Sequence, residues 1–188
     1  MRLFVAMDIP DAVRTALTSL VAALRPAGGS ARWTHVENAH VTLKFIGEVP
    51  VERAEPIRAA LMPVRLPVPI EMNFRGVGFF PDAARPRVFW AGIESGPELG
   101  ALSSAVEAAL EPVGIPRERR EFSPHLTLAR FDKAGRLESL RQAIAAAGAL
   151  EFGRGTAREF YLYQSVLKRG GAEYTRLATY NFVEEQGS

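Results

Sequence analysis

The sequence predicts an α+β protein with two pseudo-symmetric lobes, in which antiparallel sheets carry helices on their outer faces and a cleft separates the lobes. Three observations indicate this class: an internal repeat, strand and helix patterns in the same order in both halves, and the absence of a long linker between the halves. The chain has 188 residues, of which 47% are hydrophobic and 23% charged, so it can bury a core and has an average globular composition. We therefore expect one bilobal domain over residues 1–188.

The repeat is clearest at two short motifs, "HVTL" from residue 40 and "HLTL" from residue 125, which lie 125 − 40 = 85 residues apart. The same offset places "RLFVA" of residues 2–6 on "RVFWA" of residues 87–91 without a gap. The two motifs are therefore predicted to be equivalent positions of a duplicated unit.

Each half begins with a predicted strand followed by a predicted helix. Residues 2–9 and 87–93 are rich in β-branched and aromatic residues, which is typical of strands. Asp11 is a suitable N-cap for the first helix. Apolar residues then recur at helical spacing, namely Val13, Ala16, Leu17, Leu20, Val21 and Leu24 in the first half, and Leu99, Leu102, Val106 and Leu110 in the second.

Each half continues with the motif strand, a second helix and a further strand. The second helices are indicated by Ile57, Ala60 and Leu61 in the first half and by Leu137, Leu140 and Ile144 in the second. Further strands are expected over residues 69–80 and 157–167, and a final strand over residues 174–182. The sequence repeats therefore cover approximately residues 2–86 and 87–171.

The side chains of each motif strand are expected to alternate between an apolar face and a polar face, because successive residues of a strand point in opposite directions. The apolar face of the first strand is predicted to carry Val41, Leu43 and Phe45. The polar faces are predicted to carry His40, Thr42 and Lys44 in the first half, and His125 and Thr127 in the second. Each histidine therefore shares a face with the threonine two residues later.

Two such faces across a pseudo-twofold axis would bring two imidazoles and two hydroxyls into the cleft. This set suits the metal-free cleavage of a phosphodiester, which needs one base for the attacking oxygen and one acid for the leaving oxygen. A histidine with a pKa of about 6.5 can serve in either role at cellular pH, and threonine hydroxyls can donate to the nonbridging oxygens. We therefore expect His40, His125, Thr42 and Thr127 to be the catalytic residues.

Other site classes and other locations are disfavoured by composition. The chain has no cysteine, which excludes disulfides, thiolate catalysis and cysteine-ligated metal. Two histidines without an acidic residue on the motif faces leave a zinc site short of ligands, so neither a metal nor a cofactor is expected. No window approaches the roughly 18 consecutive apolar residues of a membrane span, and the N-terminus lacks a signal cleavage site. We expect a cytoplasmic protein, with a monomer as the default state.

Several further residues near the motifs are candidates with an ordinary alternative. Arg130 ends the second motif strand and could bind the phosphate, although the first copy has Phe45 there and a solvated arginine is an equal alternative. "RERRE" over residues 117–121 could attract a polyanion or form a solvated loop. His35 has Arg120 as its equivalent and is expected to be a loop or structural residue. Four aromatic residues could stack on a base, although most are expected in the core: Trp33, Trp90, Phe80 and Tyr163.

The motifs and their surroundings resemble a known family. "HVTL" and "HLTL" are accompanied by "RLFVAMDIP" at the start, "RVFWAG" before the second half, "FSPHLTLAR", and "LYQSVLKRGGAEYTRL" near the end. This combination, which covers nearly the whole chain, resembles the two-histidine (2H) phosphoesterases with their HXTX motifs. Within them, it is similar to the RNA 2',3'-cyclic phosphodiesterase family, also called 2'-5' RNA ligase.

The resemblance implies a bilobal α+β fold, no metal cofactor, and hydrolysis of the 2',3'-cyclic phosphate at an RNA or oligonucleotide end to a 2'-phosphate. It also implies that His40 donates a proton to the leaving 3'-oxygen, that His125 activates water, and that Thr42 and Thr127 bind the phosphate; Arg130 matches the family's motif ending. The residues alone do not separate the roles of the two histidines. Two alternatives are 2'-5' joining of RNA ends in the same cleft and a nucleotide- or RNA-binding module without turnover.

Overall fold

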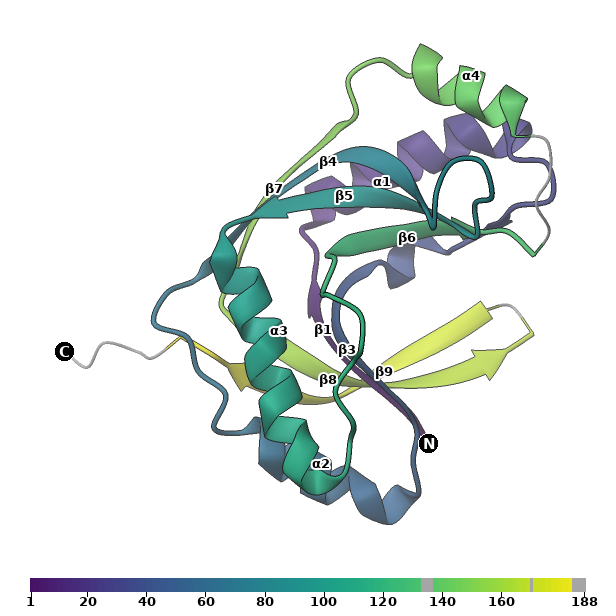
Figure 1. Cartoon of the computed structure of the whole chain (residues 1–188). Coiled ribbons are helices and arrows are strands. Elements are labelled where there is room, and N and C mark those ends of the chain that lie inside the picture. The colour runs from purple at the N-terminus through teal and green to yellow at the C-terminus, as the bar shows by residue number, and fades with distance from the viewer. Residues whose placement is uncertain (133–136, 170, 184–188) are drawn as a thin grey trace.

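The computed structural model describes residues 1–132, 137–169 and 171–183, and shows two curled antiparallel sheets with helices on their outer faces (Figure 1). The elements are, in chain order, β1 (Arg2–Asp8), α1 (Asp11–Leu24), β2 (Arg32–Trp33), β3 (His40–Glu48), α2 (Ala54–Leu61), β4 (Ile70–Phe80), β5 (Val88–Ser95), α3 (Pro97–Leu110), β6 (His125–Arg130), α4 (Glu138–Ala146), β7 (Glu151–Ala157), β8 (Glu159–Lys168) and β9 (Gly171–Asn181). The predicted α+β class with helices outside antiparallel sheets is confirmed. Within the described segments, no helix is both long and apolar enough to cross a membrane.

Each sheet is built from strands of both sequence repeats. The first sheet has the strand order β3-β1-β8-β9, and the second has the order β2-β6-β5-β4-β7. The helices change sides as well: α1, which follows β1 of the first sheet, packs on β7 and α4, while α3, which follows β5 of the second sheet, packs on β3 and α2. Figure 1 shows α1 and α4 over the second sheet and α2 and α3 over the first. A sequence repeat is therefore not a lobe, because the two repeats interlock.

The ungapped alignment of the two halves is wrong outside the motif strands. Asp8 of β1 pairs with His40, and Gly92 of β5 pairs with His125. The offset between β1 and β5 is therefore 92 − 8 = 84 residues, whereas the offset between the motifs that they pair with is 125 − 40 = 85. The offset between the first residues of α1 and α3 is 97 − 11 = 86. A shift of one residue along a strand turns every side chain to the opposite face.

The hydrophobic clusters show that alternate residues of β1 lie on opposite faces of the first sheet. The main core, which joins the sheets to their helices, contains Leu3, Met7 and Phe89. A separate cluster on the cleft side of the first sheet consists of Phe4, Ala6, Tyr161 and Tyr163, with Tyr174 packed against it. Phe4 and Phe89, which the ungapped alignment made equivalent, thus belong to different clusters.

Helix α1 starts one residue earlier than expected from capping chemistry. Asp11 is its first residue, and the N-cap is Pro10, which makes no side-chain hydrogen bond to the helix. The predicted capping role of Asp11 is therefore wrong. Its carboxylate lies in the first turn, where a negative charge still suits the helix dipole.

A β-bulge in each motif strand overturns part of the predicted alternation. Thr42 pairs with Ala6 but Lys44 pairs with the adjacent Val5, so Leu43 is an extra residue on β3. The strand turns over at such a bulge. Lys44, expected beside His40 and Thr42, therefore points into the interior and is buried. Phe45, expected on the apolar face, lines the cleft and is 57% exposed.

The second motif strand repeats this bulge. Thr127 pairs with Trp90, and Ala129 pairs with Phe89, the neighbour of Trp90. Ala129 is buried, as Lys44 is, and Arg130 lines the cleft, as Phe45 does. The duplication therefore preserved the local geometry while the residues at these two positions diverged.

Candidate active site

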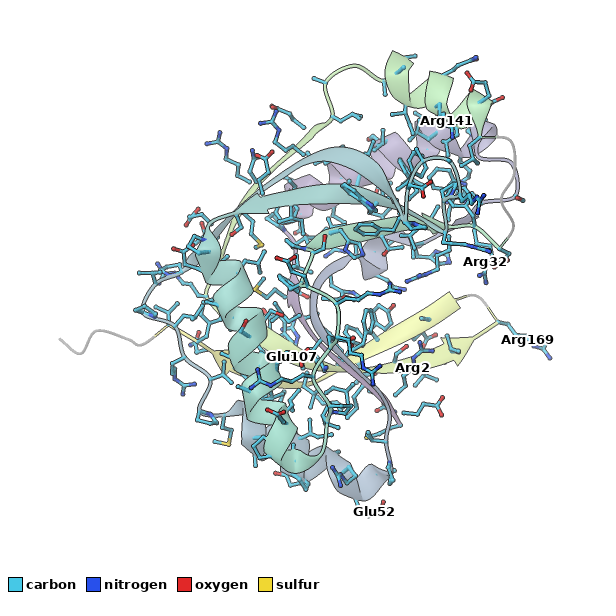
Figure 2. All side chains as sticks on the ribbon, viewed as in Figure 1. Arg2, Arg32, Glu52, Glu107, Arg141 and Arg169 are labelled. Carbon is cyan, nitrogen blue, oxygen red and sulfur yellow. The ribbon has the colours of Figure 1, made fainter. Side chains whose placement is uncertain are left out.

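A cavity of about 960 Å³ lies between the two sheets. Its walls come from β3, α3, β6, the end of β4, the start of β5 and the segment that leads into β6. Figure 2 shows side chains of both sheets in the space between them. Of the five predicted site residues, four line the cavity: Thr42, His125, Thr127 and Arg130.

His125 is anchored at one nitrogen and packed on one side. Its Nδ1 lies 2.8 Å from the carbonyl oxygen of Ser123. Because a carbonyl oxygen can only accept, Nδ1 carries the hydrogen, and Nε2 is the nitrogen that can accept or donate a proton in the cavity. Phe80 packs edge-on against the ring, with 5.0 Å between the ring centroids.

His40 has the same anchor but a more enclosed ring, and it lies beside the cavity rather than in its lining. Its Nδ1 is 2.7 Å from the carbonyl oxygen of Asn38, and 123 − 38 = 85, so the two anchors are equivalent. The imidazole stacks on Phe4 at 4.6 Å and meets Tyr174 edge-on at 5.2 Å. The packing fixes the plane of the ring and leaves Nε2 as the nitrogen that can exchange a proton.

Burial lowers the pKa of both histidines from the usual value, and the anchoring carbonyl oxygens partly oppose this. The charges around the two rings differ. Asp8 raises the pKa of His40, while Arg14 on α1 lowers it. Arg130 lowers the pKa of His125, and no carboxylate of the described residues is among the groups that shift it. The twofold symmetry of the site is thus broken in its electrostatics.

The two threonines provide hydroxyls on both walls. Thr42 and Thr127 line the cavity, and neither hydroxyl has a hydrogen-bond partner within residues 1–132, 137–169 and 171–183. The backbone of Thr127 is held by Thr34, whose hydroxyl donates to its carbonyl oxygen at 2.7 Å. Both hydroxyls are therefore free to donate to an oxyanion in the cleft.

Four arginines line the cavity, at the start of β5, at the end of β6 and in the segment that leads into β6. They are Arg130, Arg87, Arg117 and Arg120, and four residues of the "RERRE" segment belong to the cleft wall, because Glu118 and Glu121 line it beside the two arginines. Arg117 forms an exposed ion pair with Glu111 at 2.8 Å, and no ion pair of Arg130 or Arg120 is present in the described part of the chain. The wall can therefore receive phosphate groups.

The predicted aromatic residues have different positions. Phe80 lines the cavity, and Tyr163 belongs to the aromatic cluster behind His40. Trp33 packs edge-on against core residue Phe89, and Trp90 packs on Phe80 with its indole N–H buried and without a partner in the described region. His35 lies outside the cavity, against the backbone of the β8–β9 hairpin.

Phe45 and Asp8 lie at the candidate site although their sequence context did not indicate it. Phe45 was assigned to the apolar face because strict alternation ignores the bulge. Asp8 could have been found from the pairing of β1 with β3, since it lies opposite His40, but an isolated strand end gives no pairing information. Among the described residues, no group of three or more histidines and carboxylates could hold a metal ion.

Two sheets that each present a His-x-Thr strand to one cleft form the arrangement of a two-histidine phosphoesterase. A family model described as "2'-5' RNA ligase superfamily" matches residues 9–168. The chain therefore belongs to the 2'-5' RNA ligase superfamily, and the resemblance noted in its sequence is confirmed.

Relatives of similar length support this assignment. An RNA 2',3'-cyclic phosphodiesterase of Archaeoglobus fulgidus is 33% identical over 180 residues, which cover 96% of this chain and 99% of the relative. One of Thermus thermophilus is 35% identical over 196 residues, which cover 100% and 93%.

Solved structures show the same fold. The protein TT0787 of Thermus thermophilus aligns with a TM-score of 0.80 at 32% identity and covers 99% of this chain and 100% of its own. E. coli LigT complexed with 3'-AMP aligns with a TM-score of 0.79 at 26% identity and covers 97% and 98%. The predicted bilobal fold is confirmed by these neighbours.

Proposed function

We propose that this protein hydrolyses 2',3'-cyclic phosphate ends of RNA or oligonucleotides to 2'-phosphates by metal-independent acid–base catalysis. The observation that carries the proposal is the pair of equivalent Nδ1 anchors, which leave one free Nε2 on each histidine. The curated relatives named RNA 2',3'-cyclic phosphodiesterase support the substrate class.

The reaction assigns one task to each histidine. Nε2 of neutral His125 removes a proton from water as the water oxygen attacks phosphorus. The bond from phosphorus to the 3'-oxygen breaks, and Nε2–H of protonated His40 gives its proton to that oxygen. The hydroxyls of Thr42 and Thr127 donate to the nonbridging oxygens, where negative charge develops. The products are a 3'-hydroxyl and a 2'-phosphate.

The charge near His125 supports its role as the base. The cation of Arg130 lowers the pKa of this histidine, in addition to the effect of burial, so His125 is held in the neutral form that a base requires. An arginine at this place can also hold the phosphate through paired hydrogen bonds. Arg130 therefore serves both the substrate and the base.

The equivalent position on the other wall suits a nucleobase. Phe45 presents an exposed ring to the cleft, and exposed aromatic rings in nucleic-acid sites stack on bases. A nucleoside on this side has its ribose next to the wall that carries His40. The leaving 3'-oxygen then faces the proposed acid.

The function is tested with an oligonucleotide that ends in a 2',3'-cyclic phosphate, incubated with excess EDTA. We expect full activity and a 2'-phosphate product, and a loss of at least about 100-fold in His40→Ala and in His125→Ala. Activity that disappears with EDTA contradicts the proposal, as does activity that survives both substitutions. A 3'-phosphate product would reverse the assignment of the leaving oxygen.

End joining is a second candidate, favoured by the description of the matching family model. It is the same chemistry with a ribose hydroxyl in place of water, and the catalytic residues are the same. A reaction with one RNA bearing a cyclic phosphate and another bearing a free 5'-hydroxyl distinguishes the two activities. A 2'-5' linked product that accumulates faster than the 2'-phosphate favours joining, and the reverse favours hydrolysis.

A further inference from the structure

The twofold symmetry of the cleft is broken at the residue that pairs with each histidine. Asp8, the last residue of β1, lies directly opposite His40 on β3, whereas Gly92 lies opposite His125. Directly paired residues of antiparallel strands have Cα atoms about 4.5 to 5.5 Å apart. One histidine therefore has a carboxylate in the neighbouring strand, and the other has no side chain there.

The carboxylate of Asp8 is held in place although it is 41% exposed. Tyr163 donates its hydroxyl hydrogen to Oδ1 at 2.6 Å, and Arg176 donates from Nη2 to Oδ2 at 2.6 Å. The guanidinium of Arg176 lies over the ring of Tyr161 at 3.7 Å, which fixes the arginine in turn. We call Asp8, Tyr163 and Arg176 the Asp8 clamp.

The donors of the clamp keep their hydrogens at any pH at which the enzyme works. Burial, together with the hydrogen bond to Asp8, raises the pKa of Tyr163 to about 12, so its hydroxyl stays protonated. Arg176 is a permanent cation. The carboxylate of Asp8 is thus held by two donors, and its negative charge stays at a fixed position.

Of the two charged side chains that shift the pKa of His40, Asp8 is the anion, and it favours the protonated form of the ring. The cation of Arg14 on α1 lowers the pKa of His40. The hydrogen bond to the backbone carbonyl of Asn38 raises this pKa, as Asp8 does. Tyr163 on β8 and Tyr174 on β9 contact the ring as neutral groups. His125 and Arg130 lie on the second sheet, and Arg176 is engaged by Asp8 itself.

We propose that Asp8 is a positioning residue whose clamped carboxylate favours the protonated form of His40 against the effect of burial and thereby makes His40, rather than His125, the acid. This proposal rests on the proposed function, because it explains how two equivalent histidines acquire different tasks. Asp8 contacts neither substrate nor reacting atoms, since it acts through the imidazole. No hydrogen bond joins it to His40, so its influence is electrostatic.

The direct test is an NMR titration of the three histidines in the native protein and in Asp8→Asn. We expect the pKa of His40 to fall by about 0.5 to 1 pH unit in the variant, and that of His125 to stay constant. Asp8→Glu, which keeps the charge, restores most of the difference. Asp11→Asn, which removes a carboxylate from the first turn of α1, is the matched control and leaves both values unchanged.

A kinetic test separates the acid from the base. With a cyclic-phosphate oligonucleotide at pH 8, kcat/KM of Asp8→Asn falls about three- to tenfold, which is the same pKa shift expressed as a rate. With bis(4-nitrophenyl) phosphate, whose leaving group needs no proton, we expect no such loss. An equal loss on both substrates overturns the assignment to the acid.

A pKa of His40 that is unchanged in a folded Asp8→Asn protein overturns the proposal. Thermal unfolding of the variant verifies that it is folded. If the native protein does not hydrolyse the cyclic phosphate, the proposed function fails, but the NMR titration still decides whether Asp8 controls His40. The two ideas can therefore fail separately.

Discussion

The two motif histidines, His40 and His125, have the same backbone anchors and different electrostatic neighbours. The anchoring carbonyls of Asn38 and Ser123 are equivalent in the repeat and hold Nδ1 in both rings. The sequence predicted the pair because the repeated motif identified it. It could not separate their roles, because a repeat reports only equivalence, whereas the roles depend on side chains that other strands bring to each ring.

The pH dependence of the reaction should respond to Arg130. Its charge lowers the pKa of His125, so Arg130→Met should raise that pKa. A base with a higher pKa loses its proton at a higher pH, and the acidic limb of the kcat/KM profile therefore moves to higher pH. Arg130→Lys is the control that keeps the charge. An acidic limb that does not move in Arg130→Met contradicts the electrostatic role.

Substrate affinity should depend on Phe45. Stacking on one base contributes about 1 to 3 kcal/mol, so Phe45→Ala should raise KM by about tenfold with a smaller change in kcat. Stability should not change much, because the ring is largely exposed. Leu167→Ala is the matched control, since Leu167 is 71% exposed on the β8–β9 hairpin and does not line the cavity. Equal KM values in the two variants would exclude stacking on Phe45.

The faces of Lys44 and Phe45 could not be predicted from alternation. The period-two pattern of "HVTLKF" holds only until the bulge at Leu43. The bulge is defined by hydrogen bonding to β1, and a single strand carries no record of its partner. The prediction was therefore correct for His40 and Thr42, before the bulge, and wrong for the two residues after it.

At the scale of elements, a buried ion pair ties the first motif strand to the segment that leads into the second. Nζ of Lys44 lies 2.9 Å from Glu107 of α3 and donates to the carbonyl oxygen of Pro116 at 2.7 Å. Glu107 also accepts from the backbone N–H of Glu118 at 3.1 Å. Figure 2 shows Glu107 on the side of α3 that faces the sheet. The arginine-bearing wall of the cleft is thus fixed to β3.

Lys44→Met should destabilise the fold by about 3 kcal/mol, because it leaves the largely buried carboxylate of Glu107 without its partner. Urea unfolding followed by circular dichroism measures this free energy. The control is Arg32→Met, which breaks an ion pair whose partners are 67% and 64% exposed and which should cost less than about 1 kcal/mol. Similar free energies for both variants would show that Lys44 is not a structural anchor.

The existence of the elements was more predictable than their partners. The predicted strands over residues 69–80 and 157–167 correspond to β4 and β8, and the predicted final strand over 174–182 overlaps β9. The helices were found because one face of each is apolar at helical spacing. Local periodicity reports which face of an element is buried. It therefore predicts single helices and strands, but it does not predict which elements pack or pair with one another.

At the scale of the whole molecule, neither half of the chain should fold alone. Residues 1–86 hold β1 and β3 without β8 and β9, and α1 with only β2 and β4 of the sheet that it covers. Exposed sheet edges and an uncovered helix face are then unavoidable. Residues 1–86 and 87–188, produced separately, should show undispersed NMR spectra and regain dispersion when mixed. A dispersed spectrum from either half alone would contradict the interlocked description.

The exchange of strands and helices between the two halves could not be predicted from the sequence. A repeat predicts which segments are equivalent, such as β1 and β5, but each segment can pair within its own copy or with the other. The choice between β1 with β4 and β1 with β8 is decided by packing across the molecule. Only the pseudo-twofold relation itself, which both choices preserve, could be predicted.

The path of the chain also determines the width of the cleft. The backbone crosses from one layer to the other between β1 and α1, β2 and β3, α2 and β4, β5 and α3, α3 and β6, and β7 and β8. Two layers that open on a single hinge are joined by one flexible connection. In this fold, all of the connections between the layers would have to bend together. The two walls are therefore joined at many points along the chain, and these connections restrain any change in the width of the cleft.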